Sequence, residues 1–177
     1  MTTLYLFTLG SNPELSASEC FLRLKAEGLQ PTIIAGTPTY LIVGVSREIP
    51  SSFLQRLGGT DRIARIISTT PKPWGPDTDT AELISSLALA DSPQHKINIG
   101  VSSIGLQNNF CRQMGMALKK AGKEHTLRLR LLFPTGRSSK LNSAQVIFND
   151  LLDPPNTELV FIKHQTTYYL ARTVAIL

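Results

Sequence analysis

The sequence predicts an α+β protein with two domains. Short apolar runs typical of strands alternate with helical segments, and residues 1–70 follow the order β-α-β-β-α-β. That order is typical of a ferredoxin-like domain, which we expect at residues 1–70. A proline-rich segment at 71–78 cannot continue a helix or a central strand and is expected to be a linker. A second alternation of helices and strands predicts an α/β domain at 79–177.

The element boundaries of the first domain follow from turn and cap residues. The strand at 4–10 is apolar on both faces and ends in a Gly-Ser-Asn-Pro turn. The next helix is expected to begin with a capping box between Ser16 and Glu19 and to end at Gly28. The remaining expected elements are a hairpin of strands at 31–35 and 40–45, a short helix at 50–57 and a strand at 62–67.

The second domain is expected to alternate helices with strands. The predicted elements are helices at 79–90, at 110–122 and from Asn142, and strands at 96–102, 126–133, 158–163 and 168–176. Trp74 is the only tryptophan of the chain. Because a large aromatic side chain is usually buried, we expect Trp74 to pin the linker onto one of the domains.

The segment Arg137–Gln145 is the main candidate for a binding site. It is a basic loop that leads into a helix, where Asn142 and Gln145 have the spacing of a capping box. Four apolar residues fall on one face of that helix, which is therefore expected to be buried: Ala144, Ile147, Phe148 and Leu151. The free amides of a helix start, with Arg137 and Lys140 beside them, favour an anion such as a phosphate backbone. A helix that is capped only for packing, with both cations solvated, would show the same pattern.

The positive charge of the chain is concentrated in its second half. The net charge is +5, but residues 96–177 hold eleven Lys or Arg against four Asp or Glu, a net of +7, and residues 1–95 carry −2. Two predicted elements add cations that would flank the loop: Lys119, Lys120 and Lys123 at a helix end, and Arg128 and Arg130 on one strand face. Three basic elements in one domain suit a polyanion such as RNA. These cations have alternative explanations: a favourable interaction of the lysines with the helix dipole, a solvated sheet face that carries the arginines, and solubility for the basic half as a whole.

Catalytic and metal chemistry find little support in the sequence. Cys20 and Cys111 lie on separate apolar helix faces without a C-x-x-C pair, which indicates a reduced, cytoplasmic setting and no metal site. His95, His125 and His164 are scattered beside turns, are read as surface residues, and have no partner for a catalytic triad. No apolar run is long enough to span a membrane, and no G-x-G-x-x-G or P-loop follows a strand.

Asp153-Pro154-Pro155-Asn156 is close to the Asp/Asn-Pro-Pro-aromatic motif with which amino-group methyltransferases position a target nitrogen. It has Asn156 in place of the aromatic residue and follows a helix instead of a strand. Two prolines after a helix are typical of a helix stop. We therefore assign no catalytic role to Asp153.

Three segments, in this order along the chain, resemble a known family: Tyr5–Gly10 with Pro13–Ser16, Leu141–Val146, and Tyr168–Ala175. They are similar to the N-terminal, RNA-binding half of the THUMP-containing tRNA guanosine-N2 methyltransferases of the archaeal and eukaryotic type. The resemblance implies a ferredoxin-like domain followed by a THUMP domain that binds the acceptor end of tRNA. It also carries Asn142 and Ser143 over as RNA-facing groups.

In that family a methyl-transfer domain that binds S-adenosylmethionine follows the matching region. The resemblance implies that this chain, which ends at Leu177, is a non-catalytic fragment without a cofactor of its own, or else a free-standing THUMP protein. The expected partners are tRNA and the methyltransferase domain of the parent protein, with no membrane and no metal.

The sequence therefore predicts a tRNA-binding module. The rival interpretation is an adaptor for protein association that uses the ferredoxin-like half or the final strand as an exposed sheet edge. A small-molecule enzyme of the ferredoxin-like type would need a pocket with converging polar groups, and the sequence shows none.

Overall fold

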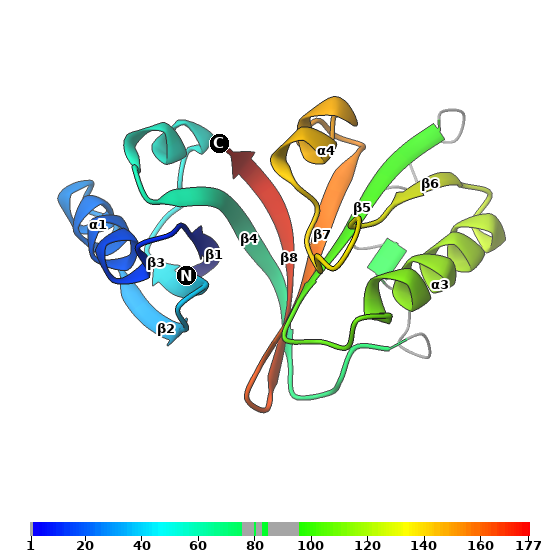
Figure 1. The fold of residues 1–177 in the computed structure, drawn as a ribbon, viewed down its shortest axis with the longest axis horizontal. Helices are drawn as coiled ribbons and strands as arrows, with labels where there is room; N and C mark the ends of the chain where they lie inside the picture. Colours follow the sequence, from blue (N-terminus) through cyan, green and yellow to red (C-terminus); the bar gives the residue numbers. More distant parts are fainter. Residues whose placement is uncertain (1, 76–79, 81–82, 85–95) are drawn as a thin grey trace. The chain divides into compact units, whose positions relative to one another are not determined.

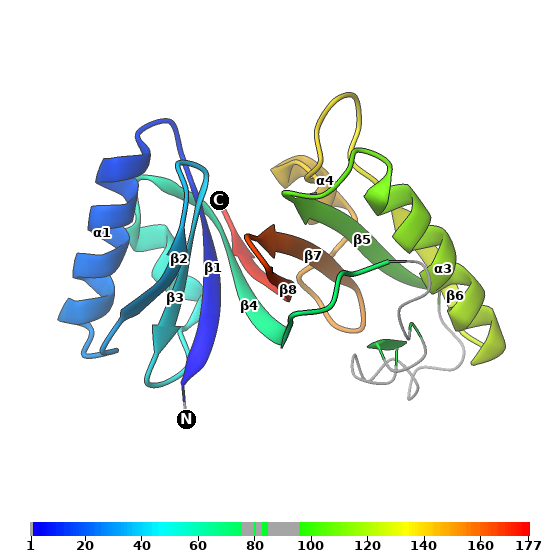
Figure 2. The same cartoon turned by 90° about the horizontal axis from the view of Figure 1, so that it is seen from below.

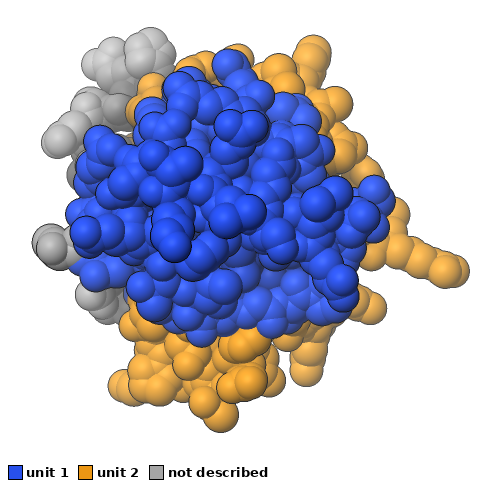
Figure 3. All heavy atoms as spheres, turned by 90° about the vertical axis from the view of Figure 1, so that its left-hand side faces the viewer, with its two compact units in different colours: residues 1–68, 171–177 blue, residues 69–170 orange. Residues whose placement is uncertain are grey.

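The computed structural model describes residues 2–75, 80, 83–84 and 96–177 (Figure 1). The chain divides into two compact units, coloured separately in Figure 3. Unit 1 is Met1–Ser68 with Ala171–Leu177, and unit 2 is Thr69–Leu170. Both units combine strands with few helices, which confirms the predicted α+β class.

The sheet of unit 1 has the strand order β2-β3-β1-β4-β8. Its strands are β1 (Thr3–Leu9), β2 (Thr32–Gly36), β3 (Tyr40–Val45), β4 (Thr60–Thr70) and the second half of β8 (Thr167–Ile176). β1 pairs antiparallel with both β3 and β4, and β2 pairs antiparallel with β3. With helix α1 (Pro13–Ala26) and the 3₁₀ helix η1 (Ser51–Arg56) as connections, this is the expected β-α-β-β-α-β order with a shortened second helix.

Helix α1 begins earlier than the sequence predicts, so the expected Ser16/Glu19 capping box is wrong. Asn12 is the N-cap without a side-chain cap bond, and Pro13 occupies the first helical turn, where its missing N–H costs nothing. Ser16 Oγ donates to the carbonyl oxygen of Asn12 at 2.7 Å. The Glu19 carboxylate instead accepts from the amides of two residues that precede β4, Gly58 and Gly59, at 3.0 and 3.1 Å.

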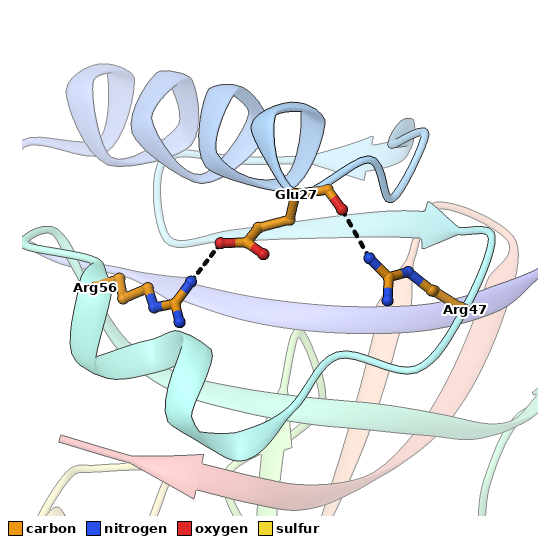
Figure 4. A network of polar contacts seen from close by, with 3 residues as sticks. All are labelled: Glu27, Arg47 and Arg56. Atoms are coloured by element: carbon orange, nitrogen blue, oxygen red, sulfur yellow. Dashed lines mark hydrogen bonds and ion pairs between the residues drawn. The ribbon is translucent and has the colours of Figure 1, made fainter.

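An ion-pair network ties the end of α1 to the segments around η1 (Figure 4). Arg47 donates to the carbonyl oxygen of Glu27 at 2.8 Å, and Arg56 pairs with the Glu27 carboxylate. A second pair in this unit joins Arg65 to Glu48 at 2.6 Å. Such exposed pairs contribute little stability, about 0 to 1 kcal/mol each, but they do neutralise two arginines of unit 1, Arg56 and Arg65.

Unit 2 is built on three parallel strands, β5 (Lys96–Ile104), β6 (Arg128–Leu132) and β7 (Thr157–His164). β5 lies between the other two and is parallel to both, and the first half of β8 follows β7 in the order β8-β7-β5-β6. Helix α3 (Phe110–Glu124) connects β5 to β6, and helix α4 (Ser143–Phe148) lies between β6 and β7. The two helices lie on opposite faces of this sheet (Figure 2).

The core of unit 2 lies between α3 and one sheet face. Met114 and Leu118 of α3 are fully buried against alternate residues of β5 and β7, such as Ile99 and Phe161. Trp74 packs against this core, with its ring 5.6 Å from that of Phe161 in an edge-to-face arrangement. This contact confirms that Trp74 packs onto one of the domains, which is unit 2.

The structure bears on two expectations about the chain's organisation. The helix expected at 79–90 lies mostly outside the described residues, although Leu83 and Ile84 of that segment are buried in the core of unit 2. The compact units also differ from the expected ranges, because Ala171–Leu177 belongs with residues 1–68. The reason is that β8 has a hydrogen-bonded neighbour on each side, β4 and β7. No described helix combines the length and the apolar character needed to cross a bilayer.

Candidate nucleic-acid interface

The basic loop between β6 and α4 ends in the capping box that the sequence predicts. Gln145 N donates to Asn142 Oδ1 at 2.8 Å, and Asn142 N donates to Gln145 Oε1 at 3.0 Å. The Gln145 side chain also donates to the carbonyl oxygen of Phe133, where the loop leaves β6, at 3.2 Å. The helix start and the two ends of the loop are therefore held in one conformation.

Buried polar groups of the sheet anchor this loop. Ser102 Oγ accepts from the amide of Leu141 at 2.9 Å and donates to the carboxylate of Glu158 at 2.6 Å. Ser102 and Glu158 are completely buried, and Leu141 is 2% exposed. Their bonds hold the loop against β5 and β7, so the residues just before Leu141 remain at the surface in a defined place.

A second anchor lies one residue further along the strand. Ser103 N donates to the carbonyl oxygen of Ser139 at 2.7 Å. The thiol of Cys111, in the first turn of α3, contacts Ser103 Oγ at 3.3 Å and Ser139 O at 3.6 Å. Burial raises the pKa of Cys111, against the opposing effect of the Ser103 hydrogen bond. Cys111 is therefore a neutral packing group and not a nucleophile.

The cations of the loop are at the surface. Arg137 is exposed and Lys140 is half-buried. Ser138 fixes the backbone between them, since its hydroxyl donates to the carbonyl oxygen of Lys140 at 2.7 Å and accepts from its amide at 3.1 Å. Asn142 is exposed and Ser143 half-buried, but the Asn142 side chain is already used by the cap.

The buried face of α4 is not the one that helical spacing predicts. Ile147 is 58% exposed and Phe148 is 85% exposed, and Ala144 is also at the surface. Val146 is instead the buried residue of the helix. With only six residues, α4 is held mainly by what flanks it, Leu141 before and Leu151 after, and these two side chains fill the space beside Gly100.

The three lysines of α3 are not brought to the loop. Lys119, Lys120 and Lys123 are exposed on the side of α3 away from its core residues Met114 and Leu118. Because α3 packs on the sheet face opposite α4, these lysines belong to a different surface. The expectation that all the predicted cations form one surface is therefore wrong for α3.

The two arginines of β6 do share the α4 face of the sheet. Arg128 and Arg130 are exposed and alternate with Leu129, which is part of the core on the α3 side. In the parallel register Arg130 lies beside Asn98, and the Asn98 side chain donates to the carbonyl oxygen of Asn149 at the end of α4 at 3.2 Å. The end of α4 is thus next to the arginine pair.

The structure adds Lys96, which the sequence reasoning missed. It is exposed at the start of β5 and paired in register with Arg128. Alternation along the strand predicts that Lys96 and Asn98 lie on the same face of the sheet. Only the pairing of β5 with β6 shows that Arg128 and Arg130 lie on that face too. We use the term α4 face for the surface that carries these groups: Lys96, Arg128, Arg130, Arg137, Lys140, Asn142 and Ser143.

Within the described ranges, the cations of the α4 face form no ion pairs. Among the residues that the structure describes, no carboxylate forms an ion pair with Lys96, Arg128, Arg130, Arg137 or Lys140. The arginines of unit 1 named above, in contrast, have acceptors. Several cations on one surface favour the binding of a polyanion.

The described parts of the chain show no metal site, and the Asp153–Asn156 segment has a structural role there. No group of three His, Cys, Asp or Glu side chains in those parts could hold a metal ion. His125 is exposed and His164 half-buried, and His95 lies outside the described residues. In the Asp153–Asn156 segment, Asn156 Oδ1 accepts from the Asn98 amide at 2.9 Å, which gives this side chain a structural role.

Neither a protein-family model nor a curated protein matches this sequence. Solved structures do match its fold. A possible methylase from Clostridium difficile 630 is 11% identical with a TM-score of 0.51, and the match covers 98% of this chain and 41% of that chain. TrmN from Thermus thermophilus is 8% identical with a TM-score of 0.53, covering 98% and 46%. PH1313 from Pyrococcus horikoshii Ot3 is 11% identical with a TM-score of 0.52, covering 96% and 53%.

These similarities extend over nearly the whole chain and so include both units. At such low identity they show the fold alone. This chain spans about half or less of the length of each of these three proteins.

Proposed function

We propose that this chain is a THUMP-type RNA-binding module that holds the acceptor end of tRNA through phosphate contacts on the α4 face. The observation that carries the proposal is the group of unpaired cations at both ends of α4, with Arg137 and Lys140 on an anchored loop. An anchored loop loses little conformational freedom on binding, which favours a defined contact with the backbone of RNA.

Two further points support the proposal. The sequence resembles the RNA-binding half of tRNA guanosine-N2 methyltransferases, and the fold is similar to that of a possible methylase. We infer that the chain binds the substrate RNA for a methyltransferase domain of the same parent protein. In that arrangement S-adenosylmethionine belongs to the further domain, since no G-x-G-x-x-G turn follows a strand here.

The main test is a titration of the chain with tRNA at several salt concentrations. Each lost phosphate contact reduces the slope of log affinity against log salt by roughly 0.7 to 0.9. An Arg137→Glu/Lys140→Glu double variant should therefore bind more weakly and show a slope smaller by about 1.4 to 1.8.

An Arg23→Glu/Lys25→Glu variant is the matched control. It makes the same change in net charge on exposed residues of α1, which belongs to unit 1, whereas the α4 face belongs to unit 2. Equal losses in the two double variants would mean that net charge alone governs binding, and the proposed site would be abandoned. Transfer RNA that lacks its single-stranded acceptor terminus should bind more weakly than intact tRNA, and equal binding would contradict the THUMP assignment.

A second candidate function is protein association through strand β2. β2 is at the end of the strand order and contains no charged residue, while Ile33 and Ile34 are 56% and 45% exposed. An uncharged apolar edge is a site where another strand can pair. The final strand, β8, cannot act in this way, because it has neighbours on both sides. A size in solution that depends on concentration, and that Ile33→Lys abolishes, would favour this candidate.

A further inference from the structure

Phe148 is an aromatic side chain left at the surface of unit 2. It is the last residue of α4 and is 85% exposed. Among the residues that the structure describes, every other Phe, Trp and Tyr side chain is buried or half-buried. Large aromatic residues are usually buried, so an exposed ring points to a contact that this chain alone does not make.

Phe148 belongs to the helix that has one group of cations before its start and another near its end. Lys140 and Arg137 precede the helix. At the other end, Asn149 directly follows Phe148 and its carbonyl oxygen accepts from Asn98, the neighbour of Arg130 in the register of β5 and β6. Because α4 has six residues, and each adds about 1.5 Å along the helix, the ring is within about 10 Å of the helix start along the axis.

The cations of the α4 face indicate which kind of molecule contacts Phe148. A purely apolar partner would gain nothing from the cations near the two ends of α4. A single-stranded nucleic acid satisfies both features, because its phosphates contact the cations while an exposed base stacks on the aromatic face. A basic surface that also carries an aromatic side chain is the arrangement that proteins use to bind unpaired nucleotides.

We propose that Phe148 is a stacking platform for an unpaired base of the RNA whose backbone contacts the α4 face. This inference rests on the proposed function and adds to it the residue that contacts a base and the way it does so, by stacking. Double-stranded RNA presents no free base face and does not engage Phe148.

The test uses the full chain and a short single-stranded RNA that carries the fluorescent base 2-aminopurine, whose emission is quenched when it stacks. Phe148→Leu keeps an apolar side chain but removes the ring, and it should weaken binding about 5- to 150-fold and abolish the quenching. Phe148→Tyr keeps the ring and should retain both. The salt slope should stay the same in all these variants, because no phosphate contact is removed.

Ile147→Ala is the matched control, since Ile147 is the exposed apolar neighbour on the same helix and has no aromatic face. It should bind like the wild type. A Phe148→Leu variant that binds within twofold of the wild type with full quenching would overturn the stacking proposal, while a normal wild-type salt slope would leave the proposed function intact. If the wild type binds no RNA, both proposals fail. If Phe148→Leu reduces self-association and leaves RNA binding unchanged, the ring is a protein contact and the stacking proposal is overturned.

Discussion

Replacing Ser102 with alanine should destabilise the protein by about 2 to 4 kcal/mol and release the loop that carries Arg137 and Lys140. The Ser102 hydroxyl makes two buried bonds, one from the Leu141 amide at 2.9 Å and one to the Glu158 carboxylate at 2.6 Å. A hydrogen bond to a charged group contributes roughly 1.5 to 3 kcal/mol and one between neutral groups roughly 0.5 to 1.5 kcal/mol. The expected loss is a large fraction of the stability of a typical domain, roughly 5 to 15 kcal/mol.

Urea unfolding measures the global loss, and hydrogen exchange of the Leu141 amide in the native protein measures the local one. The matched control is Ser103→Ala, at the next position of the same strand and equally buried. Its hydroxyl accepts only a weak bond from the Cys111 thiol at 3.3 Å, so the loss should be below about 1 kcal/mol. If both variants lose the same stability, or if Leu141 exchanges no faster in Ser102→Ala, the idea that Ser102 anchors the loop is refuted.

Two predictions concern unit 1. Glu19→Ala should reduce the free energy of unfolding by about 1 to 2 kcal/mol, because its carboxylate accepts from two glycine amides before β4. Glu14→Ala, an exposed position in the first turn of α1, should change it by less than about 0.5 kcal/mol, and urea midpoints compare the two. Burial, with a smaller effect from the charge of Glu19, raises the pKa of Cys20 from 9.0 to about 12. Above pH 9 the unfolded thiol ionises while the folded one stays neutral, so stability should fall between pH 9 and 12 by at most about 1.4 kcal/mol per pH unit. Cys20→Ala should show a shallower decline, and an unchanged profile would contradict this assignment.

Local sequence patterns correctly predicted the elements that are stabilised by contacts between residues close in sequence. The hairpin of β2 and β3, the end of α1 at Gly28 and the Asn142/Gln145 capping box all involve residues within a few positions of one another. For such elements the backbone conformation is governed by turn and cap residues, and these are visible in the sequence.

The same reasoning failed where a distant partner decides the outcome. Glu19 was expected to cap its own helix, but the amides of Gly58 and Gly59 take its carboxylate. The apolar stripe of α4 was expected to be buried, yet Val146 is buried and Phe148 is exposed. A helix of six residues has too little surface of its own for periodicity to decide its orientation, and the packing of the flanking leucines determines it instead.

By itself, the sequence determined the α+β class, the basic character of the second half and the presence of a capped, cationic loop, because composition and short-range spacing are sufficient for each. Only the tertiary structure decided which cations share a surface. The parallel pairing of β5 with β6 brings Lys96 and Arg128 together, and the packing of α3 on the other sheet face removes its lysines from them. The physical reason is that the face of a sheet on which a side chain lies depends on strand register and on the side that each helix covers, and both are set by contacts between residues far apart in the chain.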